Sequence, residues 1–268
     1  MKINFVKMQA QGNDYIYFER KNIPFSSLPS LAVKLSDRHK GVGSDGIIVL
    51  EKSDGGVIFK IFNADGSEGK ICGNGIRSAG VYAVKHMGLT SPVKFFTLSG
   101  EKTVDVKTVG EKFIATADMG KPKEFLSSEF FTEKLQEVDL YVNERDVFAI
   151  NVGNDHAVFF SGLPLDYAVS HTRSCNLFTG GINVECAVKS NGGGLRAEVF
   201  ERGSGKTLSC GSGAVAVAYS AVISKRAKRD EFIPVKMPGG TLEVKINGDG
   251  NAFLRGEVEE VFKGEYEI

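Results

Sequence analysis

Two Cys-Gly-x-Gly motifs carry the strongest chemical signal in the sequence, CGNG at 72–75 and CGSG at 210–213. Each thiol stands where an apolar helical pattern begins, and glycines follow it directly. Unpaired backbone N–H groups at a helix start bind anions, and glycines let the backbone approach a ligand closely. The same helix end favours a thiolate over a thiol. Each motif therefore predicts a reactive cysteine beside an anion-binding helix start.

One such motif alone leaves an alternative open, because a buried structural cysteine next to a Gly-rich turn has the same pattern. The two motifs, however, lie at equivalent positions of an internal repeat. Segments 62–80 and 200–218 align without a gap, and the same offset pairs TVDVK at 103–107 with TLEVK at 241–245. GNDYIYF at 12–18 also resembles GNDHAVF at 153–159. Two copies are too few for a solenoid, so the repeat predicts two similar domains related by a pseudo-twofold axis.

The coarse pattern of elements gives the fold class. Each half has several short alternating patterns bounded by Gly, Asn and Asp, and one apolar helix pattern that starts at its cysteine. A smaller helix is expected at 27–36. The sequence thus predicts an α+β protein with two pseudo-symmetric strand-rich domains, each wrapped around a central helix. The domains are placed at 1–118 and 119–268, with linker-like Pro, Gly and Ser near 118–125.

A thiol on each side of a bound carboxylate suits the inversion of a stereocentre by proton transfer. This reaction needs a base on one face of the carbon and an acid on the other, and a thiolate and a thiol can exchange these roles. General acid and base catalysis contributes about 10²–10⁴-fold, so donors aimed at the developing enediolate must supply the rest. Two helix starts can do this, and no cofactor is required.

Composition and decoy motifs exclude several other classes. Lys plus Arg and Asp plus Glu both number 33, so no basic excess indicates nucleic-acid binding. No signal-peptide core or membrane-length apolar stretch is expected, and four cysteines without metal-ligand spacing favour a cytoplasmic protein with reduced thiols and no zinc. GVGSDG at 41–46 lacks the strand-to-helix context of a dinucleotide site, and GSGKT at 203–207 lacks the first glycine of a P-loop.

Nearly the whole chain resembles the diaminopimelate epimerase family, most specifically in FNADG followed by CGNG and in ERG followed by CGSG. The resemblance implies two pseudo-symmetric domains with the site between them. It implies interconversion of LL- and meso-2,6-diaminopimelate, for lysine and peptidoglycan-precursor synthesis, without pyridoxal phosphate. It also implies a small-molecule substrate and a homodimer.

The resemblance also assigns roles to residues. The two thiols are Cys72 and Cys210, and they match positions beside a histidine and a glutamate, His156 and Glu201. The positions that match carboxylate binding are Gly73, Asn74, Gly211 and Ser212. The positions that match the rest of the substrate site are Asn13, Asn63, Asn154, Asn183, Glu201 and Arg202. Without the resemblance, the asparagines would suit turns and His156 an ordinary strand.

Two positions depart from the family pattern. Asp155 stands where the family usually has proline, which predicts a looser loop and a carboxylate beside His156. Gly46 replaces a frequent glutamine and removes one possible polar contact. Cys175 and Cys186 match no functional position.

Three other interpretations can be weighed against this one. The nearest is a racemase of the same fold that acts on proline, hydroxyproline or histidine, although Asn63, Asn183 and Arg202 favour a substrate with a second polar end. A binding protein that has lost activity would not be expected to retain both thiols, His156 and Glu201. An isomerase of this fold without the cysteine pair does not fit Cys72 and Cys210.

Overall fold

The protein is described by a computed structural model that covers residues 2–23 and 27–267. It is strand-rich and mixed α+β, so the predicted fold class is confirmed. The chain divides into two compact units, which are described one at a time. Unit 1 consists of 1–118 with 255–268, and unit 2 consists of 119–254.

Unit 1 is built on a ring of strands. Its helices are α1 (Leu28–Ser36) and α2 (Gly73–Met87), with a short 3-10 turn at Arg20–Asn22. Its strands are β1 (Lys2–Ala10), β2 (Asn13–Glu19), β3 (Gly46–Ser53), β4 (Gly56–Asn63), β5 (Glu68–Gly69), β6 (Val93–Thr97), β7 (Gly100–Val109), β8 (Lys112–Gly120) and β17 (Ala252–Glu267). Pairing runs β17–β1–β2–β3–β4–β6–β7–β8, and β8 pairs with β17, so eight strands close into a barrel.

Unit 2 repeats the same order of elements. Its helices are α3 (Ser128–Gln136), α4 (Leu165–Ser174) and α5 (Gly211–Ile223), with a 3-10 turn at Glu144–Asp146. Its strands are β9 (Lys123–Leu126), β10 (Val147–Asn151), β11 (Asp155–Phe159), β12 (Asn183–Lys189), β13 (Leu195–Glu201), β14 (Gly205–Thr207), β15 (Ile233–Met237) and β16 (Gly240–Ile246). Pairing runs β9–β10–β11–β12–β13–β15–β16, with parallel pairs β11–β12 and β13–β15 that match β2–β3 and β4–β6 of unit 1.

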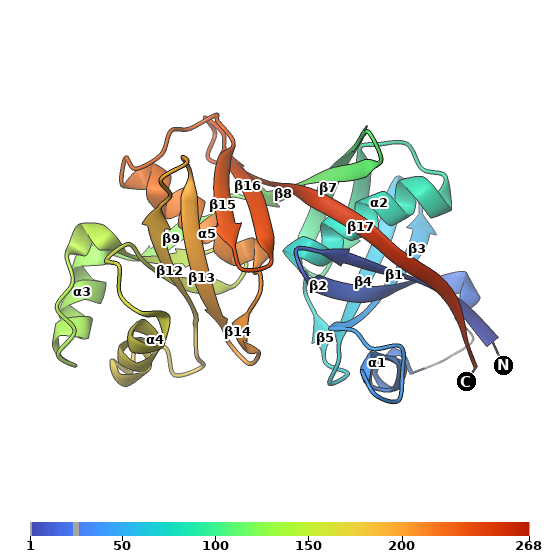
Figure 1. Cartoon of the computed structure of the whole chain (residues 1–268), viewed down its shortest axis with the longest axis horizontal. Coiled ribbons are helices and arrows are strands. Elements are labelled where there is room, and N and C mark those ends of the chain that lie inside the picture. The colour runs from blue at the N-terminus through green and yellow to red at the C-terminus, as the bar shows by residue number, and fades with distance from the viewer. Residues whose placement is uncertain (1, 24–26, 268) are drawn as a thin grey trace. The chain divides into compact units, whose positions relative to one another are not determined.

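Each unit wraps its strands around the helix that follows its cysteine (Figure 1). Helix α2 packs on β1, β2, β3, β6 and β7, and α5 packs on β10, β11, β12, β13, β15 and β16. From Gly73 to Ala83 every residue of α2 is buried, including the large side chains of Arg77 and Tyr82. Gly88 ends α2 in the left-handed conformation, at a φ of 67°, that glycine adopts without strain. The expected central helices, and the smaller helix at 27–36, are therefore confirmed.

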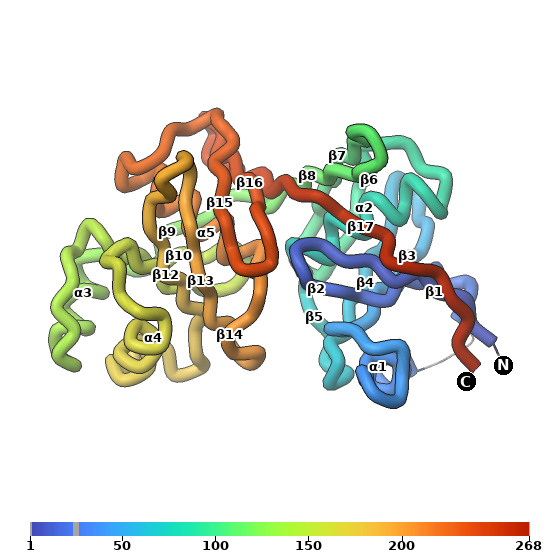
Figure 2. Tube along the Cα trace, viewed as in Figure 1, coloured from blue at the N-terminus to red at the C-terminus, as the bar shows by residue number. Residues whose placement is uncertain are grey.

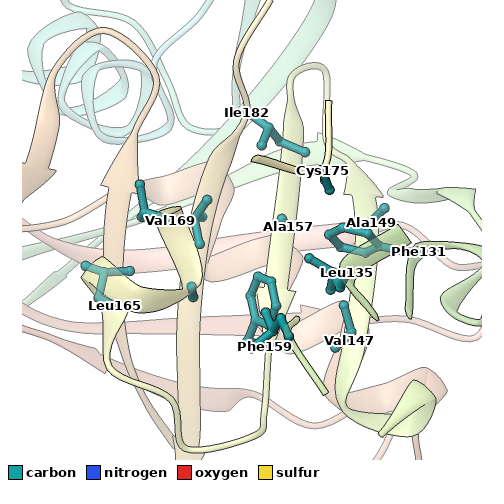
Figure 3. Close-up of a cluster of buried hydrophobic side chains, with 13 residues drawn as sticks. Phe131, Leu135, Val147, Ala149, Ala157, Phe159, Leu165, Val169, Cys175 and Ile182 are labelled. Carbon is teal, nitrogen blue, oxygen red and sulfur yellow. The ribbon is translucent and has the colours of Figure 1, made fainter. Parts of the chain in front are cut away.

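An apolar cluster in unit 2 lies on the outer side of its sheet, under α3 and α4 (Figure 3). Phe131 of α3 packs edge-on against Phe159 of β11, at a ring-centroid separation of 6.0 Å. Leu165 and Val169 of α4 belong to the same cluster. These two helices cover the strands that carry His156 and Asn183, and thereby fix the backbone of the site.

Two segments differ from the sequence expectation. Residues 123–126, predicted as linker, form β9 and pair with β10, because Phe125 and Leu126 continue an extended pattern past Pro122. The last segment, 255–268, was placed with the second domain but groups with unit 1, because β17 runs antiparallel to β1 (Figure 2). Within the ranges that the structure describes, no helix is both long and apolar enough to cross a membrane.

Candidate active site

The first half-site lies in unit 1, at the start of α2. Cys72 is the N-cap residue, and its Sγ accepts a hydrogen bond from the Gly75 N–H at 3.4 Å. The Ile76 N–H begins the helical ladder by donating to the Cys72 carbonyl. The N–H groups of Gly73 and Asn74 stand at the helix positions that have no partner within the helix, as an anion cradle requires.

Strand β2 holds the Cys72 thiol through Asn13 and Tyr15. The thiol donates to Asn13 Oδ1 at 3.3 Å, and Asn13 Nδ2 donates to Asp45 Oδ2 at 2.5 Å, which fixes the orientation of the amide. The Tyr15 hydroxyl also contacts Cys72, and burial first and the nearby thiol second raise its pKa well above the usual value for tyrosine. Asn13 is thus a neighbour of Cys72 in the structure, and its contact with substrate stays a prediction.

A fully buried arginine supports this helix start from inside the barrel. Arg77 donates to the Gly73 carbonyl and to Asn74 Oδ1, both at 3.0 Å, and also to Gln11 Oε1. Burial lowers the pKa of Arg77 to about 10, so it is charged at neutral pH. The side-chain oxygen of Asn74 is therefore occupied by Arg77. The group of Asn74 that can bind an anion is its backbone N–H.

The second half-site lies in unit 2 and repeats the geometry of the first. Cys210 is the N-cap of α5, and its Sγ accepts from the Gly213 N–H at 3.3 Å. Ser212 Oγ lies 3.4 Å from the same sulfur. Burial raises the pKa of Cys210 well above that of an ordinary thiol, and the carboxyl groups of Glu201 and Glu185 raise it further. Both effects favour the thiol form of Cys210 over its thiolate.

His156 and Glu185 form a buried pair behind Cys210. Both side chains are fully buried, and His156 Nδ1 lies 2.7 Å from Glu185 Oε1. His156 Nε2 lies 3.0 Å from Asn154 Oδ1. The imidazole is therefore held at both ring nitrogens, by Glu185 on one side and by Asn154 on the other.

Glu201 is also close to the second thiol. Its Oε1 accepts from Thr207 Oγ1 at 2.6 Å, and its carboxyl hydrogen-bonds Cys210. Burial raises the pKa of Glu201, while the bonds from Thr207 and Cys210 act in the opposite direction. The structure therefore brings together His156, Glu201 and Cys210 in unit 2, as well as Asn13 and Cys72 in unit 1.

The remaining predicted residues lie at strand ends. Asn63 is exposed at the end of β4 and donates to Ser67 Oγ at 2.9 Å. Asn183 begins β12, where its amide donates to the Asp155 carbonyl and accepts from the Arg202 N–H, both at 2.9 Å. Arg202 is exposed, and its guanidinium has no ion-pair partner among the residues that the structure describes. Gly211 is buried at the first position of α5.

The two departures from the family pattern have structural explanations. A Cβ at Gly46 would lie 2.2 Å from the Phe62 carbonyl oxygen, so the backbone here leaves no room for a larger residue. The carboxylate of Asp155 accepts from Asn151 Nδ2 at 2.6 Å, across the β10–β11 pair. The carboxylate that contacts His156 is that of Glu185 instead, which differs from the expectation for Asp155.

Sequence reasoning missed Glu185, Asp45 and Arg77. Glu185 and Asp45 lie in segments that carry the family resemblance, but alternation on a strand does not reveal the buried charge of Glu185, and Asp45 lies in the loop before β3. The spacing of Arg77, one helical turn after Gly73, could have indicated that it bonds back to the helix start. Among the described side chains, no group of three or more His, Cys, Asp and Glu could hold a metal ion.

Comparison with known proteins finds relatives that span the chain. The diaminopimelate epimerase family model matches residues 5–125 and 148–261. A diaminopimelate epimerase from Bacillus licheniformis is 38% identical over 98% of both chains. One from Leptospira biflexa is 33% identical over 100% of both chains.

Solved structures show the same fold at low sequence identity. A predicted epimerase from Pseudomonas aeruginosa superposes with a TM-score of 0.73 at 15% identity, over 99% of both chains. A hydroxyproline epimerase from Agrobacterium vitis has a TM-score of 0.66 at 12% identity, over 98% of this chain and 92% of its own. Together with the full-length sequence matches, these findings show that the chain belongs to the diaminopimelate epimerase family.

Proposed function

We propose that the protein interconverts LL- and meso-2,6-diaminopimelate by proton transfer between two thiols. The observation that carries this proposal is the pair of cysteine N-caps, Cys72 and Cys210, at equivalent positions of two repeated units. Each sulfur accepts the third N–H of its helix and leaves two more N–H groups for a carboxylate. The choice of substrate rests on the family to which the chain belongs.

The proposed reaction moves one proton off the α-carbon and another onto its opposite face. One cysteine, as thiolate, takes the α-hydrogen as a proton, and the bonding pair passes into the carboxylate as an enediolate. The other cysteine, as thiol, then donates its proton to the α-carbon and becomes a thiolate. Nothing is oxidised or reduced, and the two thiols end with exchanged protonation states. The helix N–H groups stabilise the enediolate because they point at charge that develops during the reaction.

The polar residues at strand ends suit a substrate that is itself an amino acid at both ends. Arg202 is exposed and has a guanidinium that can hold a second carboxylate through two parallel hydrogen bonds. Asn63, Asn154 and Asn183 provide amides for the distal ammonium and carboxylate. Proline and hydroxyproline have no second charged end, so they would leave this set without partners.

The wider biochemical setting is part of the same proposal. The protein works without pyridoxal phosphate or a metal, as a homodimer in the cytoplasm, in the synthesis of lysine and peptidoglycan precursors. Four free cysteines are compatible with a reducing compartment.

The test is a substrate panel with purified protein and no added cofactor. LL-diaminopimelate, L-proline, trans-4-hydroxy-L-proline and L-histidine are incubated separately, and the isomers are resolved by chiral chromatography. We expect meso-diaminopimelate to form, with conversion of the other amino acids at least about 100-fold slower, because they offer no second amino-acid end to Asn63, Asn183 and Arg202. Faster turnover of any other amino acid would contradict the proposed substrate.

A further inference from the structure

The carboxylate of Glu185 is unusual for a strand residue that faces a central helix. Its side chain is fully buried. A Cβ placed on Gly213, the third residue of α5, would lie 2.6 Å from Glu185 Oε1. Oε2 has no hydrogen-bond partner in the part of the chain that the structure describes. A buried carboxylate that is only half satisfied costs stability, so packing alone does not account for it.

The repeat offers a direct comparison for this position. In unit 2, His156 pairs in register with Asn183 and Ala157 with Val184, while in unit 1 Ile16 pairs with Ile47. The repeat matches Ala157 to Ile16, so their strand partners Val184 and Ile47 also match. The residues that follow these partners, Glu185 and Ile48, are therefore equivalent. The packing agrees, because a Cβ on Gly75 would meet Ile48 Cδ1 at 2.8 Å, as one on Gly213 meets Glu185. The same fold is thus built with an apolar residue at this place.

The neighbours of Glu185 are the groups of the second half-site. His156 of β11 contacts Glu185 at 2.7 Å. The charge of Glu185 also raises the pKa of the Cys210 thiol at the start of α5. Glu201 of β13 is the other carboxylate near the thiol, and Cys186, on the other face of β12, is the next titratable group. Among these groups, only the His156 ring is able to carry a positive charge.

We infer that Glu185 is a positioning residue that keeps His156 turned towards Asn154 and keeps Cys210 in the thiol form. The contact at Nδ1 fixes the ring, and the negative charge beside the start of α5 opposes the helix end, which otherwise favours the thiolate. Cys210 is then ready to donate a proton, which is the role of the acid in the proposed reaction. The inference rests on the proposed function only for that last step.

The experiment measures how fast each cysteine reacts, so it needs no catalytic activity. Native enzyme, in reductant-free buffer at pH 8, is treated with iodoacetamide for increasing times, and the alkylation of all four cysteines is read by peptide mass spectrometry. Only the thiolate reacts, so below its pKa the rate of each cysteine rises about tenfold per unit fall in that pKa. Glu185→Gln keeps the shape of the side chain and removes its charge. We expect the rate at Cys210 to rise about tenfold, a shift of about one pH unit.

Internal and external controls separate charge from loss of structure. In the same sample, Cys72 in unit 1 and the buried Cys175 in the apolar cluster should keep their rates within about twofold. The matched variant Glu198→Gln removes a carboxylate from the neighbouring strand, which lies near Cys186. It should accelerate Cys186 and leave Cys210 unchanged.

A second variant guards against poor folding of the first. His156→Tyr combined with Glu185→Ile gives unit 2 the pair that unit 1 already accommodates at Tyr15 and Ile48. It should also accelerate Cys210 relative to Cys175. An unchanged Cys210 rate in either folded variant, or an equal acceleration by Glu198→Gln, would overturn the inference. A wild-type enzyme that shows the alkylation pattern but does not convert diaminopimelate would instead refute the proposed function alone.

Discussion

The two half-sites share one backbone arrangement and differ in the buried charge behind it. In unit 1 the fully buried charged side chain next to the helix start is Arg77 of α2, whose equivalent in α5 is Val215. In unit 2 it is Glu185 of β12, whose equivalent in β3 is Ile48. A positive charge lowers the cost of a thiolate at Cys72, and a negative charge raises it at Cys210.

This difference shows how a duplicated scaffold can supply two unlike catalytic groups. The repeat provides two equal thiols at two equal helix starts, but a proton transfer through a carbon needs one base and one acid at a time. A single buried charged residue beside the central helix of each unit, Arg77 or Glu185, makes the surroundings of the two thiols unequal. The following predictions test whether the two half-sites are both required and whether they differ as described.

The largest effect is expected from removing either sulfur. Cys72→Ala and Cys210→Ala should each reduce the interconversion of LL- and meso-diaminopimelate at least about 1000-fold in both directions, because each direction requires a base and an acid. Cys175→Ala is the control, since that thiol lies in the apolar cluster of unit 2. The comparison would break if one of the two variants kept turnover near that of the control.

Removal of the buried cation should have the next largest effect. Arg77→Met leaves Gln11 Oε1 and Asn74 Oδ1 without their donor, and we expect the free energy of unfolding to fall by about 3 kcal/mol. The rate of Cys72 alkylation should fall as well, because the thiolate loses a favourable charge. Denaturant unfolding of Arg77→Met and of the exposed control Arg196→Met checks this. Equal stabilities for these two variants would show that the buried arginine has no special role.

The glycine at the third position of each helix should respond differently in the two units. In Gly75→Ala the new methyl group meets the flexible end of Ile48, and the helix propensity gained offsets most of the strain, so stability should stay nearly unchanged. In Gly213→Ala it meets the Glu185 carboxylate, which His156 holds in place, and stability should fall by about 2 kcal/mol. Thermal unfolding of both variants checks the order. Equal losses would mean that Glu185 is not held more firmly than Ile48.

The raised pKa of Cys210 predicts a small dependence of stability on alkaline pH. Above the ordinary thiol pKa of about 8.5, the unfolded chain loses the Cys210 proton while the folded protein keeps it, so stability falls as pH rises. This thiol contributes at most about 1.4 kcal/mol per pH unit, and Cys210→Ser lacks the contribution. From pH 9 to pH 10 the wild type should therefore lose stability faster than the variant, and the difference should shrink in the Glu185→Gln background. Parallel curves for wild type and Cys210→Ser would contradict the raised pKa.

The sequence was sufficient to predict the elements that leave a local pattern or a repeat. The repeat of FNADG and CGNG in FERGS and CGSG located both helix starts, and glycine after each cysteine indicated a helix cap that the structure confirms. It was not sufficient for the buried charges, because Glu185 occupies a strand position that in unit 1 holds an isoleucine. The segment 123–126 was misread as linker because Pro122 and Gly120 resemble a boundary, although the strand that follows them pairs with β10. The pairing of β17 with β1 joins the two ends of the chain, which local patterns do not show.

The most direct test of the two-thiol account is the early labelling of substrate and product in D₂O. LL-diaminopimelate is incubated with wild-type enzyme, and both isomers are isolated within the first few per cent of conversion and analysed by mass spectrometry. If one thiol removes a proton and the other delivers one, the meso product should carry solvent deuterium at the inverted carbon from its first appearance. The remaining LL substrate should stay almost unlabelled, because the thiol on its own face holds the proton that it removed. Early meso product that keeps a substantial fraction of the original protium would show that one group acts on both faces, and would contradict the account.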